Sequence, residues 1–428
     1  MSAARPPEMQ MARPPDIRIA DLASPVLTPA QRGALAYAEK NPVVFSEPVL
    51  LEAARRQTGL ADFGADDFRA RLHVQLQSIE EDTDLNALGR LGVWSNVLRY
   101  LCNRLRLEDL LRRHPEIREV KIERPIIVAG MPRSGTTHLL NLLAADTRQR
   151  SLAYWESLEP VPVPGEGPGR DGRDPRWWRC QHAYEQMVAQ MPLIPAMHDM
   201  PPEHIHEEIE LQELDFATYL LEWLCRPVRW RDHYLSLDMR PHYAYLKKAL
   251  QALTWLRGPS RWVLKSPQHL EQLVPLFETF PDAVVAITHR DPVSVIRSAI
   301  TMLAYGDRMR RTRVDAAGLA AYWSTRVEQL LGACVRDRDK LPAEQSIDVP
   351  FDAFMADDVG MVARIYEKAG LALTADVRAR LDAFLAENPR GKYGQVRYDL
   401  RGDFGIEPSE LRRRFDFYFE RFPVRVEV

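Results

Sequence analysis

Cysteine is scarce in this sequence of 428 residues, which contains four: Cys102, Cys180, Cys225 and Cys334. Without a CxxC pair they suit neither a disulfide framework nor a zinc site, and they favour a reducing compartment. Long apolar runs are missing too, since no stretch reaches the roughly 18 residues of a membrane-spanning helix. The N-terminus also lacks the apolar segment of a secretory signal. We therefore expect a cytoplasmic protein without stable membrane insertion.

A strong excess of one charge is equally absent. The net charge of −3 argues against a general nucleic-acid-binding protein, so local basic clusters must carry any anion binding. Hydrophobic residues make up 46% of the chain and charged residues 27%, which is ordinary for a globular protein. The length allows one large domain or two smaller ones. It does not indicate an oligomeric state, and a homo-oligomer stays open.

The segment 125–143 has the pattern of a strand, a glycine loop and a helix. A short β-branched run ends at Gly130, Gly135 follows five residues later, and leucines at helical spacing come next. This arrangement directs backbone N–H groups and a helix N-terminus at an anion. The spacing nearly fits the nucleotide triphosphatase loop G-x-x-x-x-G-K-[ST], but Thr136 stands where the lysine belongs. Without that lysine the loop is poorly suited to hydrolysis of ATP or GTP.

The same loop offers one guanidinium and three hydroxyls for an oxyanion. Its string Gly-Met-Pro-Arg-Ser-Gly-Thr-Thr resembles the 5′-phosphosulfate loop of sulfotransferases, which use 3′-phosphoadenosine 5′-phosphosulfate (PAPS) as donor. The resemblance implies that PAPS is bound, and adenosine 3′,5′-bisphosphate released, by Arg133, Ser134, Gly135, Thr136 and Thr137.

A second anion-binding pattern follows the expected strand 283–288. Asp291 is a candidate N-cap, Pro292 suits the first turn of a helix, and Arg290 directly precedes them. The interval from Arg290 to Ser298 resembles the sulfotransferase site for the 3′-phosphate of the donor. An arginine fork is a natural partner for a dianionic phosphate. A capped helix with a surface arginine is the alternative.

Weaker similarities lie toward the C-terminus. Arg390 and Lys392 resemble the basic loop that closes over the 3′-phosphate in sulfotransferases, although the order of the residues differs. Phe351 and Asp352 resemble a segment near the adenine pocket, where an aromatic ring can stack on the base. The resemblance covers about residues 125–405 and is strongest for bacterial members of the family.

Further strands of a parallel sheet are expected at 261–265, 283–288 and 346–349. Each precedes a helical pattern, which is typical of a three-layer α/β/α fold with a central parallel sheet. The resemblance implies the P-loop NTPase-like fold of sulfotransferases. We expect a poorly ordered, proline-rich arm at 1–27. A helical N-terminal region is expected at 28–120, with Thr28 as the capping residue of its first helix. The α/β domain is expected at 121–428.

A long insertion separates the first two of these strands, with helices expected at 176–190, 203–224 and 241–257. With its flanks it holds seven of the nine tryptophans. Most of these rings are expected in a helical core, yet an insertion at the carboxyl edge of a parallel sheet is also where acceptor pockets are built. We therefore expect residues 155–258 to form the site of a small-molecule acceptor, apolar or aromatic.

Sulfuryl transfer is an in-line displacement in which cations stabilise the transferring group and a base takes the acceptor proton. Arg133 and Lys265 are the expected cations, because Lys265 ends a predicted strand at the same sheet edge. Glu156, 23 residues beyond Arg133, is the first candidate for the base, since several bacterial sulfotransferases place a glutamate there. His269, four residues after Lys265, is its rival, by resemblance to cytosolic enzymes with a histidine two residues after that lysine.

This scheme requires no metal, and no clear ligand cluster stands out. The polar run with His198, His204 and His206 favours a solvated helix start or an acceptor-recognition surface over a metal site. Two other functions stay open, a P-loop kinase or nucleotide phosphotransferase and a non-catalytic nucleotide-binding protein. The preferred prediction is a PAPS-dependent sulfotransferase of the EC 2.8.2 type, which modifies a hydroxyl or an amine.

Overall fold

The computed structural model describes residues 16–427. A sheet of five parallel strands, in the order β3-β4-β2-β5-β6, lies at its centre. The strands are β2 (Ile126–Gly130), β3 (Gln149–Arg150), β4 (Arg261–Lys265), β5 (Val284–His289) and β6 (Ser346–Pro350). The predicted strands are confirmed to within one residue. The edge strand β3 was not predicted, because two residues are too few for a periodic pattern.

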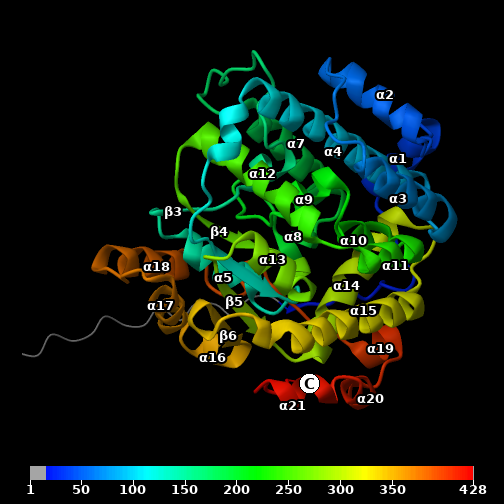
Figure 1. Cartoon of the computed structure of the whole chain (residues 1–428). Helices are drawn as coiled ribbons and strands as arrows, with labels where there is room; N and C mark the ends of the chain where they lie inside the picture. Colours follow the sequence, from blue (N-terminus) through cyan, green and yellow to red (C-terminus); the bar gives the residue numbers. More distant parts are fainter. Residues whose placement is uncertain (1–15, 428) are drawn as a thin grey trace, which may run out of the picture.

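The two faces of the sheet belong to different hydrophobic cores, since successive strand residues point to opposite sides. Ile126 and Val128 pack into the smaller core, whereas Ile127 and Ala129 pack into the larger one. The helices over the smaller core are α5 (Thr136–Ala144), α16 (Phe351–Ala356), α17 (Asp358–Ala369) and α18 (Ala375–Glu387) (Figure 1). The predicted three-layer α/β/α fold is thus confirmed.

The opposite face carries most of the helices. They include α1 (Pro29–Lys40), α2 (Glu47–Thr58), α3 (Phe68–Asp82), α4 (Ala87–Arg113), η1 (Pro115–Glu119), η3 (Pro267–Glu271), α13 (Leu273–Thr279), α14 (Pro292–Arg310), α15 (Ala316–Asp337), α19 (Leu400–Phe404), α20 (Pro408–Arg413) and α21 (Asp416–Arg421). Two short 3-10 turns, η4 (Arg338–Lys340) and η5 (Ala343–Gln345), lead into β6. Within residues 16–427, none of the helices combines the length and the apolar character needed to cross a membrane.

Helix α1 starts where the capping pattern predicts. Thr28 Oγ1 accepts a hydrogen bond from the N–H of Gln31 at 3.2 Å, and Gln31 Oε1 accepts one from the N–H of Thr28 at 2.9 Å. This reciprocal pair satisfies two backbone donors at the helix start. Helical structure then continues to residue 119, as expected for this region.

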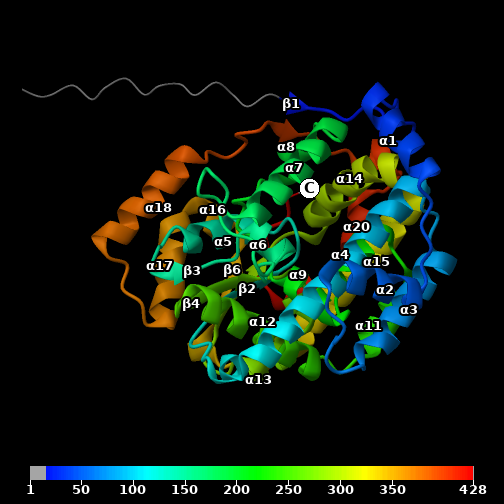
Figure 2. The same cartoon turned by 90° about the horizontal axis from the view of Figure 1, so that it is seen from above.

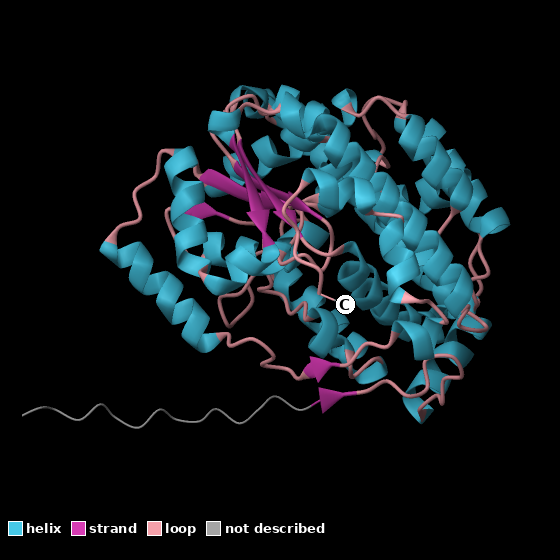
Figure 3. Cartoon of the chain, turned by 90° about the horizontal axis from the view of Figure 1, so that it is seen from below, coloured by secondary structure: helices cyan, strands magenta, loops and turns pink. Residues whose placement is uncertain are grey.

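The predicted N-terminal arm is partly packed. Residues 1–15 lie outside the described residues, but β1 (Asp16–Ile17) pairs in parallel with β7 (Gln395–Val396), apart from the main sheet (Figure 3). Ile19 and Leu22 are buried. The prediction of a poorly ordered arm is therefore wrong for residues 16–22, because these side chains find a partner surface nearly 400 positions away in sequence.

The insertion between β3 and β4 is helical, as expected. It contains α6 (Tyr154–Leu158), α7 (Pro175–Gln190), α8 (Ile194–His198), α9 (Ile209–Gln212), η2 (Glu213–Asp215), α10 (Leu220–Cys225), α11 (Val228–Ser236) and α12 (Arg240–Arg257). The single helix predicted for 203–224 is wrong. Phe216, with φ of +52°, interrupts it after η2, where Asp215 turns inward to bind Arg71 and Arg104 at 2.9 Å each. From above, α7 and α8 lie near α14 (Figure 2).

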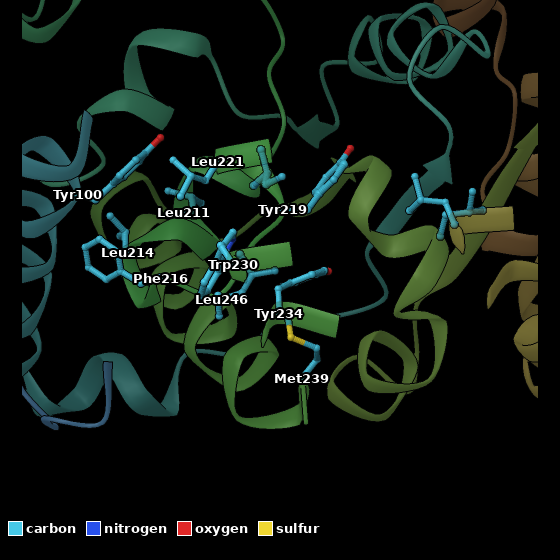
Figure 4. Close-up of a cluster of buried hydrophobic side chains, with 14 of the residues drawn as sticks. Tyr100, Leu211, Leu214, Phe216, Tyr219, Leu221, Trp230, Tyr234, Met239 and Leu246 are labelled. Atoms are coloured by element: carbon cyan, nitrogen blue, oxygen red, sulfur yellow. The ribbon is translucent and has the colours of Figure 1, made fainter. Parts of the chain in front are cut away.

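Large side chains fix this insertion to the N-terminal helices. Tyr100 of α4 faces a cluster from α9 to α12 that includes Phe216, Trp230 and Leu246 (Figure 4). Trp230 is fully buried, and its indole N–H donates to the carbonyl of Thr218 at 2.9 Å. For Trp230 the expected role in a helical core is therefore correct.

Candidate functional site

The loop after β2 approaches its neighbours so closely that both glycines are needed. A Cβ on Gly130 would lie 1.9 Å from Thr288 Oγ1 on β5. Gly135 caps α5 with φ of +89°, in the region that favours glycine, and a Cβ there would lie 3.2 Å from the ring of Phe351. The backbone of residues 131–135 is therefore held tightly against β5 and α16.

The two anion-binding motifs meet at this loop. Arg133 Nε donates to Ser298 Oγ at 2.8 Å, and Arg290 Nη1 donates to the carbonyl of Arg133 at 2.7 Å. Residues 157 positions apart come together because β2 and β5 are parallel neighbours whose carboxyl ends share one edge. Arg133 also has φ of +69°, a costly conformation for a residue with a side chain. Such strain is concentrated at functional sites.

The start of α14 has the predicted form. Asp291 Oδ1 accepts a backbone hydrogen bond of 2.9 Å from the first turn. The guanidinium of Arg290 lies over the ring of Phe351, 3.9 Å from its centroid, and donates to both carboxylate oxygens of Glu427 at 2.7 Å each. The guanidinium of Arg290 therefore already binds an anionic group in this structure.

Arg297 adds a cation that the motif comparison missed. It is half-buried, and its Nε has no hydrogen-bond partner among residues 16–427. Burial lowers the pKa of Arg297, and the neighbouring Arg290 lowers it further. A bound anion would offset both the cost of burying the Arg297 charge and its repulsion by Arg290. The only sequence signal for Arg297 is its position next to Ser298.

A cavity of about 620 Å³ opens beside the loop. Arg133, Thr136, Thr137 and Lys265 line the part beside the loop, which we call the cationic end. Many of the other lining side chains, from the insertion and α14, are apolar: Met187, Met191, Ile194, Leu220, Trp223, Leu224, Met302 and Leu303. Charged side chains also line the cavity away from the loop, namely Arg99, Glu159, Arg176, Arg179, Glu210 and Arg310. The cavity thus joins a cationic end to a long, largely apolar wall.

Lys265 ends β4 opposite Val128 of β2. Its side chain is buried, and Nζ forms an ion pair with Glu207 at the cationic end of the cavity. The backbone N–H of Lys265 donates to Glu208 Oε2 at 2.7 Å. Lys265 therefore lies in the cavity wall together with an acidic partner from the polar run 198–210.

The model of the sulfotransferase family matches residues 125–375 of this chain. The chain belongs to the sulfotransferase family. Among solved structures, sulfotransferase STF1 from Mycobacterium tuberculosis is 27% identical with a TM-score of 0.75, over 87% of this chain and 98% of that one. Sulfotransferase STF9 from Mycobacterium avium is 26% identical with a TM-score of 0.79, over 90% and 98%. No curated protein matches. The predicted family is confirmed, as is its P-loop-like fold.

In this sulfotransferase Glu156 does not line the cavity, considering the residues that the structure describes. Arg150 Nη2 donates to both of its oxygens at 3.0 and 3.1 Å, and Arg257 Nε lies 3.1 Å from Oε1. The carboxylate is 4% exposed and is held between two guanidiniums. This geometry does not support the role of base that the sequence predicts for Glu156.

His269 is also absent from the cavity lining, considering the described residues. It is 0% exposed, one ring nitrogen contacts Glu208, and the other contacts the hydroxyl of Tyr243 at 2.7 Å. Both nitrogens are therefore engaged inside the protein. The structure does not support His269 as the base either.

Ser134 uses its hydroxyl within the loop. The Oγ donates to the carbonyl of Met131 at 2.6 Å and lies 2.6 Å from Thr288 Oγ1. Its side chain is thus engaged in holding the loop against β5. The loop itself, with Gly135, Thr136 and Thr137, keeps the position that the motif predicts.

The basic pair near the C-terminus is not at the second motif. Arg390 forms two hydrogen bonds with Asp358, at 2.8 and 2.9 Å, and Asp358 also contacts His138 of α5 at 3.0 Å. Lys392 Nζ lies 3.4 Å from Asn388 Oδ1. The structure therefore gives no support to these two residues as phosphate ligands.

The imidazoles of the polar run form a row. The ring centroids of His198 and His204 are 5.5 Å apart, and those of His204 and His206 are 5.6 Å apart. Burial lowers the pKa of all three, that of His204 to about 4. Across residues 16–427, no group of three or more His, Cys, Asp and Glu side chains is arranged to hold a metal ion. His198 and His206 line the cavity as neutral rings.

These buried rings make stability depend on pH. The pKa of His204 is about 4 in the folded protein and about 6.5 when unfolded, so the unfolded chain binds the extra proton as the pH falls from 6.5 to 4. Over this range the free energy of unfolding is expected to fall by about 3 kcal/mol more for wild type than for His204→Gln. Thermal unfolding between pH 7 and pH 4.5 measures the difference, with His73→Gln on the exposed face of α3 as control. Equal slopes for all three proteins would refute this effect.

Proposed function

We propose that this protein transfers a sulfuryl group from PAPS to a hydroxyl or amine of a small, apolar or aromatic acceptor, with adenosine 3′,5′-bisphosphate as product. The contact between the two motifs carries this proposal. Arg133 bonds to Ser298, Arg290 bonds to the carbonyl of Arg133, and Arg133 lines the same cavity as Lys265. We also propose a cytoplasmic location, no nucleic-acid partner and no requirement for a metal.

The residues present fit a bisphosphorylated donor. The buried Nε of Arg297 lacks a hydrogen-bond partner within residues 16–427. The guanidinium of Arg290 donates to both carboxylate oxygens of Glu427. A phosphate offers the same acceptor geometry with more charge. Under the proposal, the loop 131–137 holds the phosphosulfate end, and Arg290 with Ser298 holds the 3′-phosphate.

PAPS supplies a sulfur whose bond to phosphate breaks when the acceptor attacks. Arg133 and Lys265 bind the negative charge of the transferring group, and the N-terminus of α5 offers backbone N–H groups at the same place. The apolar wall of the cavity excludes water and orients the acceptor toward Lys265. Its methionines and Trp223 favour an apolar body on that acceptor.

Two measurements test the proposal. The purified protein is incubated with PAPS and a panel of phenols, sterols, aliphatic alcohols, glycans and amines, and mass spectrometry detects the addition of SO₃. Calorimetry compares binding of adenosine 3′,5′-bisphosphate with that of ATP. We expect a sulfated product and preference for the bisphosphate. Preference for ATP with a phosphorylated product would point to a kinase, and bisphosphate binding without any turnover to a non-catalytic protein.

The contact between Glu427 and Arg290 leads to a further prediction. A 3′-phosphate at Arg290 has to displace the Glu427 carboxylate, so Glu427→Gln is expected to tighten binding of adenosine 3′,5′-bisphosphate. Because the pair is partly exposed, the gain is expected to be about 2- to 5-fold. Calorimetric titration measures it, with the exposed Glu420→Gln of α21 as control. Unchanged or weaker binding by Glu427→Gln would contradict a phosphate site at Arg290.

A further inference from the structure

We propose that Glu207 is the catalytic base that takes the proton from the acceptor hydroxyl, an inference that rests on the proposed sulfuryl transfer. In this step a bond forms between the acceptor oxygen and sulfur, and the bond between sulfur and the phosphate oxygen breaks. The electron pair leaves with adenosine 3′,5′-bisphosphate. The hydroxyl proton passes to a carboxylate oxygen of Glu207 and later to solvent.

A base has to face the cavity in which the acceptor lies. Three carboxylates line it within the described part of the chain: Glu159, Glu207 and Glu210. Arg179 donates to both oxygens of Glu159 at 2.7 and 2.8 Å. Glu210 accepts from Tyr100 and Arg99 of α4 through Oε2, at 2.7 and 3.1 Å, and is thereby tied to α4 rather than to Lys265. Glu207 is the carboxylate that contacts Lys265.

The neighbours of Glu207 leave half of its carboxylate available. Oε1 pairs with Nζ of Lys265, whereas Oε2 has no hydrogen bond to any residue between 16 and 427. Lys265 is the cation proposed to touch the transferring group, so a carboxylate in contact with it lies beside the attacking oxygen. A free oxygen at that place is what a proton acceptor needs.

The adjacent Glu208 explains why Glu207 points into the cavity. Glu208 is fully buried, accepts the backbone N–H of Lys265 at 2.7 Å and contacts the ring of His269. On the other side, the N–H of His206 donates to the carbonyl of Leu152 at 2.7 Å. The backbone around residue 207 is thus fixed on both sides, with Glu208 turned inward and Glu207 toward the cavity.

His198 and His206 are imidazoles that also line the cavity. Burial lowers the pKa of both well below the usual value, and Arg133 and Lys265 lower that of His198 further. Protonation of His198 would add a third positive charge beside these two cations. Protonation of Glu207 produces a neutral carboxylic acid and leaves Lys265 free to interact with the transferring group. The charges around the site therefore favour the carboxylate.

The experiment separates a base from a residue that only positions Lys265. Wild type, Glu207→Gln and Glu207→Asp are assayed with PAPS and two probe acceptors, phenol and the more acidic 4-nitrophenol, which ionises near neutral pH without help. We expect Glu207→Gln to lose about 10²–10⁴-fold in kcat with phenol and far less with 4-nitrophenol, with partial recovery in Glu207→Asp. Glu203→Gln, an exposed position bonded to Trp177, is the control.

Three other kinetic results would overturn the inference. Equal losses with both acceptors would mean that Glu207 only positions Lys265, and no loss would remove it from the reaction. A phenol-selective loss in His198→Gln instead would make the imidazole the base. Binding of adenosine 3′,5′-bisphosphate by Glu207→Gln shows that the variant is folded. Absence of any turnover by wild type would refute the proposed function itself, and this inference with it.

Discussion

Arg133→Ala is expected to lower kcat for sulfuryl transfer by about 10²–10³-fold, the usual cost of removing one preorganised donor to developing charge. The guanidinium lies where both motifs meet, bonded to Ser298 Oγ at 2.8 Å and to the carbonyl of Met197 at 2.5 Å. Its loss removes a cation from the cavity and also frees the end of α8. Steady-state kinetics with PAPS and the acceptor found by screening measures the effect.

Two companion variants sharpen this prediction. Arg133→Lys keeps the charge but loses the fork, and it is expected to recover only part of the activity. Arg380→Ala removes an exposed arginine of α18 that pairs with Asp376, and it is expected to leave kcat unchanged. Activity of Arg133→Ala within a few-fold of wild type would exclude Arg133 from the chemistry.

The cationic end of the site was predictable because it depends on local patterns and one general rule. Each motif is a strand, a turn and a helix start, which sequence spacing shows directly. The carboxyl ends of parallel strands share one edge, which is where the sequence resemblance assigns Arg133 and Arg290 to the two ends of one donor. The structure places them in contact, with β2 and β5 as direct neighbours.

The proposed base was not predictable, because its identity depends on contacts between distant residues. Glu156 has the expected spacing from Arg133, but Arg257, 101 positions further on, reaches its carboxylate. His269 lies close to Lys265 in sequence, yet Tyr243 and Glu208 enclose its ring. The polar run 198–210 stands out in the sequence, but the sequence does not show that Glu207 contacts a lysine 58 positions away.

The same limit applies to helix boundaries. Apolar spacing over 203–224 suggested one long helix, whereas the chain breaks at Phe216. The cause is tertiary, since the carboxylate of Asp215 binds Arg71, Arg104 and His242 from other helices. Buried ion pairs of this kind are costly to leave incomplete, so they outweigh local propensity.

The largest loss of stability is expected for Arg326→Met, which should cost about 3–5 kcal/mol at pH 7. Arg326 of α15 is fully buried. Its Nε lies 2.9 Å from Glu222 Oε2 on α10, and its Nη2 lies 2.7 Å from Glu271 Oε1 on η3. Methionine would fill much of the space but leave two buried carboxylates without a cation. Thermal or urea unfolding measures the loss.

The pH dependence identifies the cause. Burial already raises the pKa of Glu222, and without Arg326 it would rise further above the value in the unfolded chain. A carboxyl group whose pKa is higher in the folded protein than in the unfolded chain lowers the free energy of unfolding as the pH increases. Arg326→Met should therefore be less destabilised at pH 5 than at pH 8. Arg378→Met, which breaks an exposed pair with Asp382, should cost well under about 1 kcal/mol at either pH. Equal unfolding midpoints, in temperature or urea, for Arg326→Met and Arg378→Met would refute the argument.

This ion network also links stability to the cavity. Glu222 lies on α10 between Leu220, Trp223 and Leu224, the residues that form part of the apolar wall. Loss of Arg326 removes the ion pair between α10 and α15 and leaves the Tyr322–Glu222 hydrogen bond and the Trp223–Trp323 ring contact, while the motifs after β2 and β5 stay in place. Arg326→Met is therefore expected to raise KM for the acceptor more than the dissociation constant of adenosine 3′,5′-bisphosphate. A loss of nucleotide binding as large as the loss of acceptor binding would show that the two ends of the cavity are not supported separately.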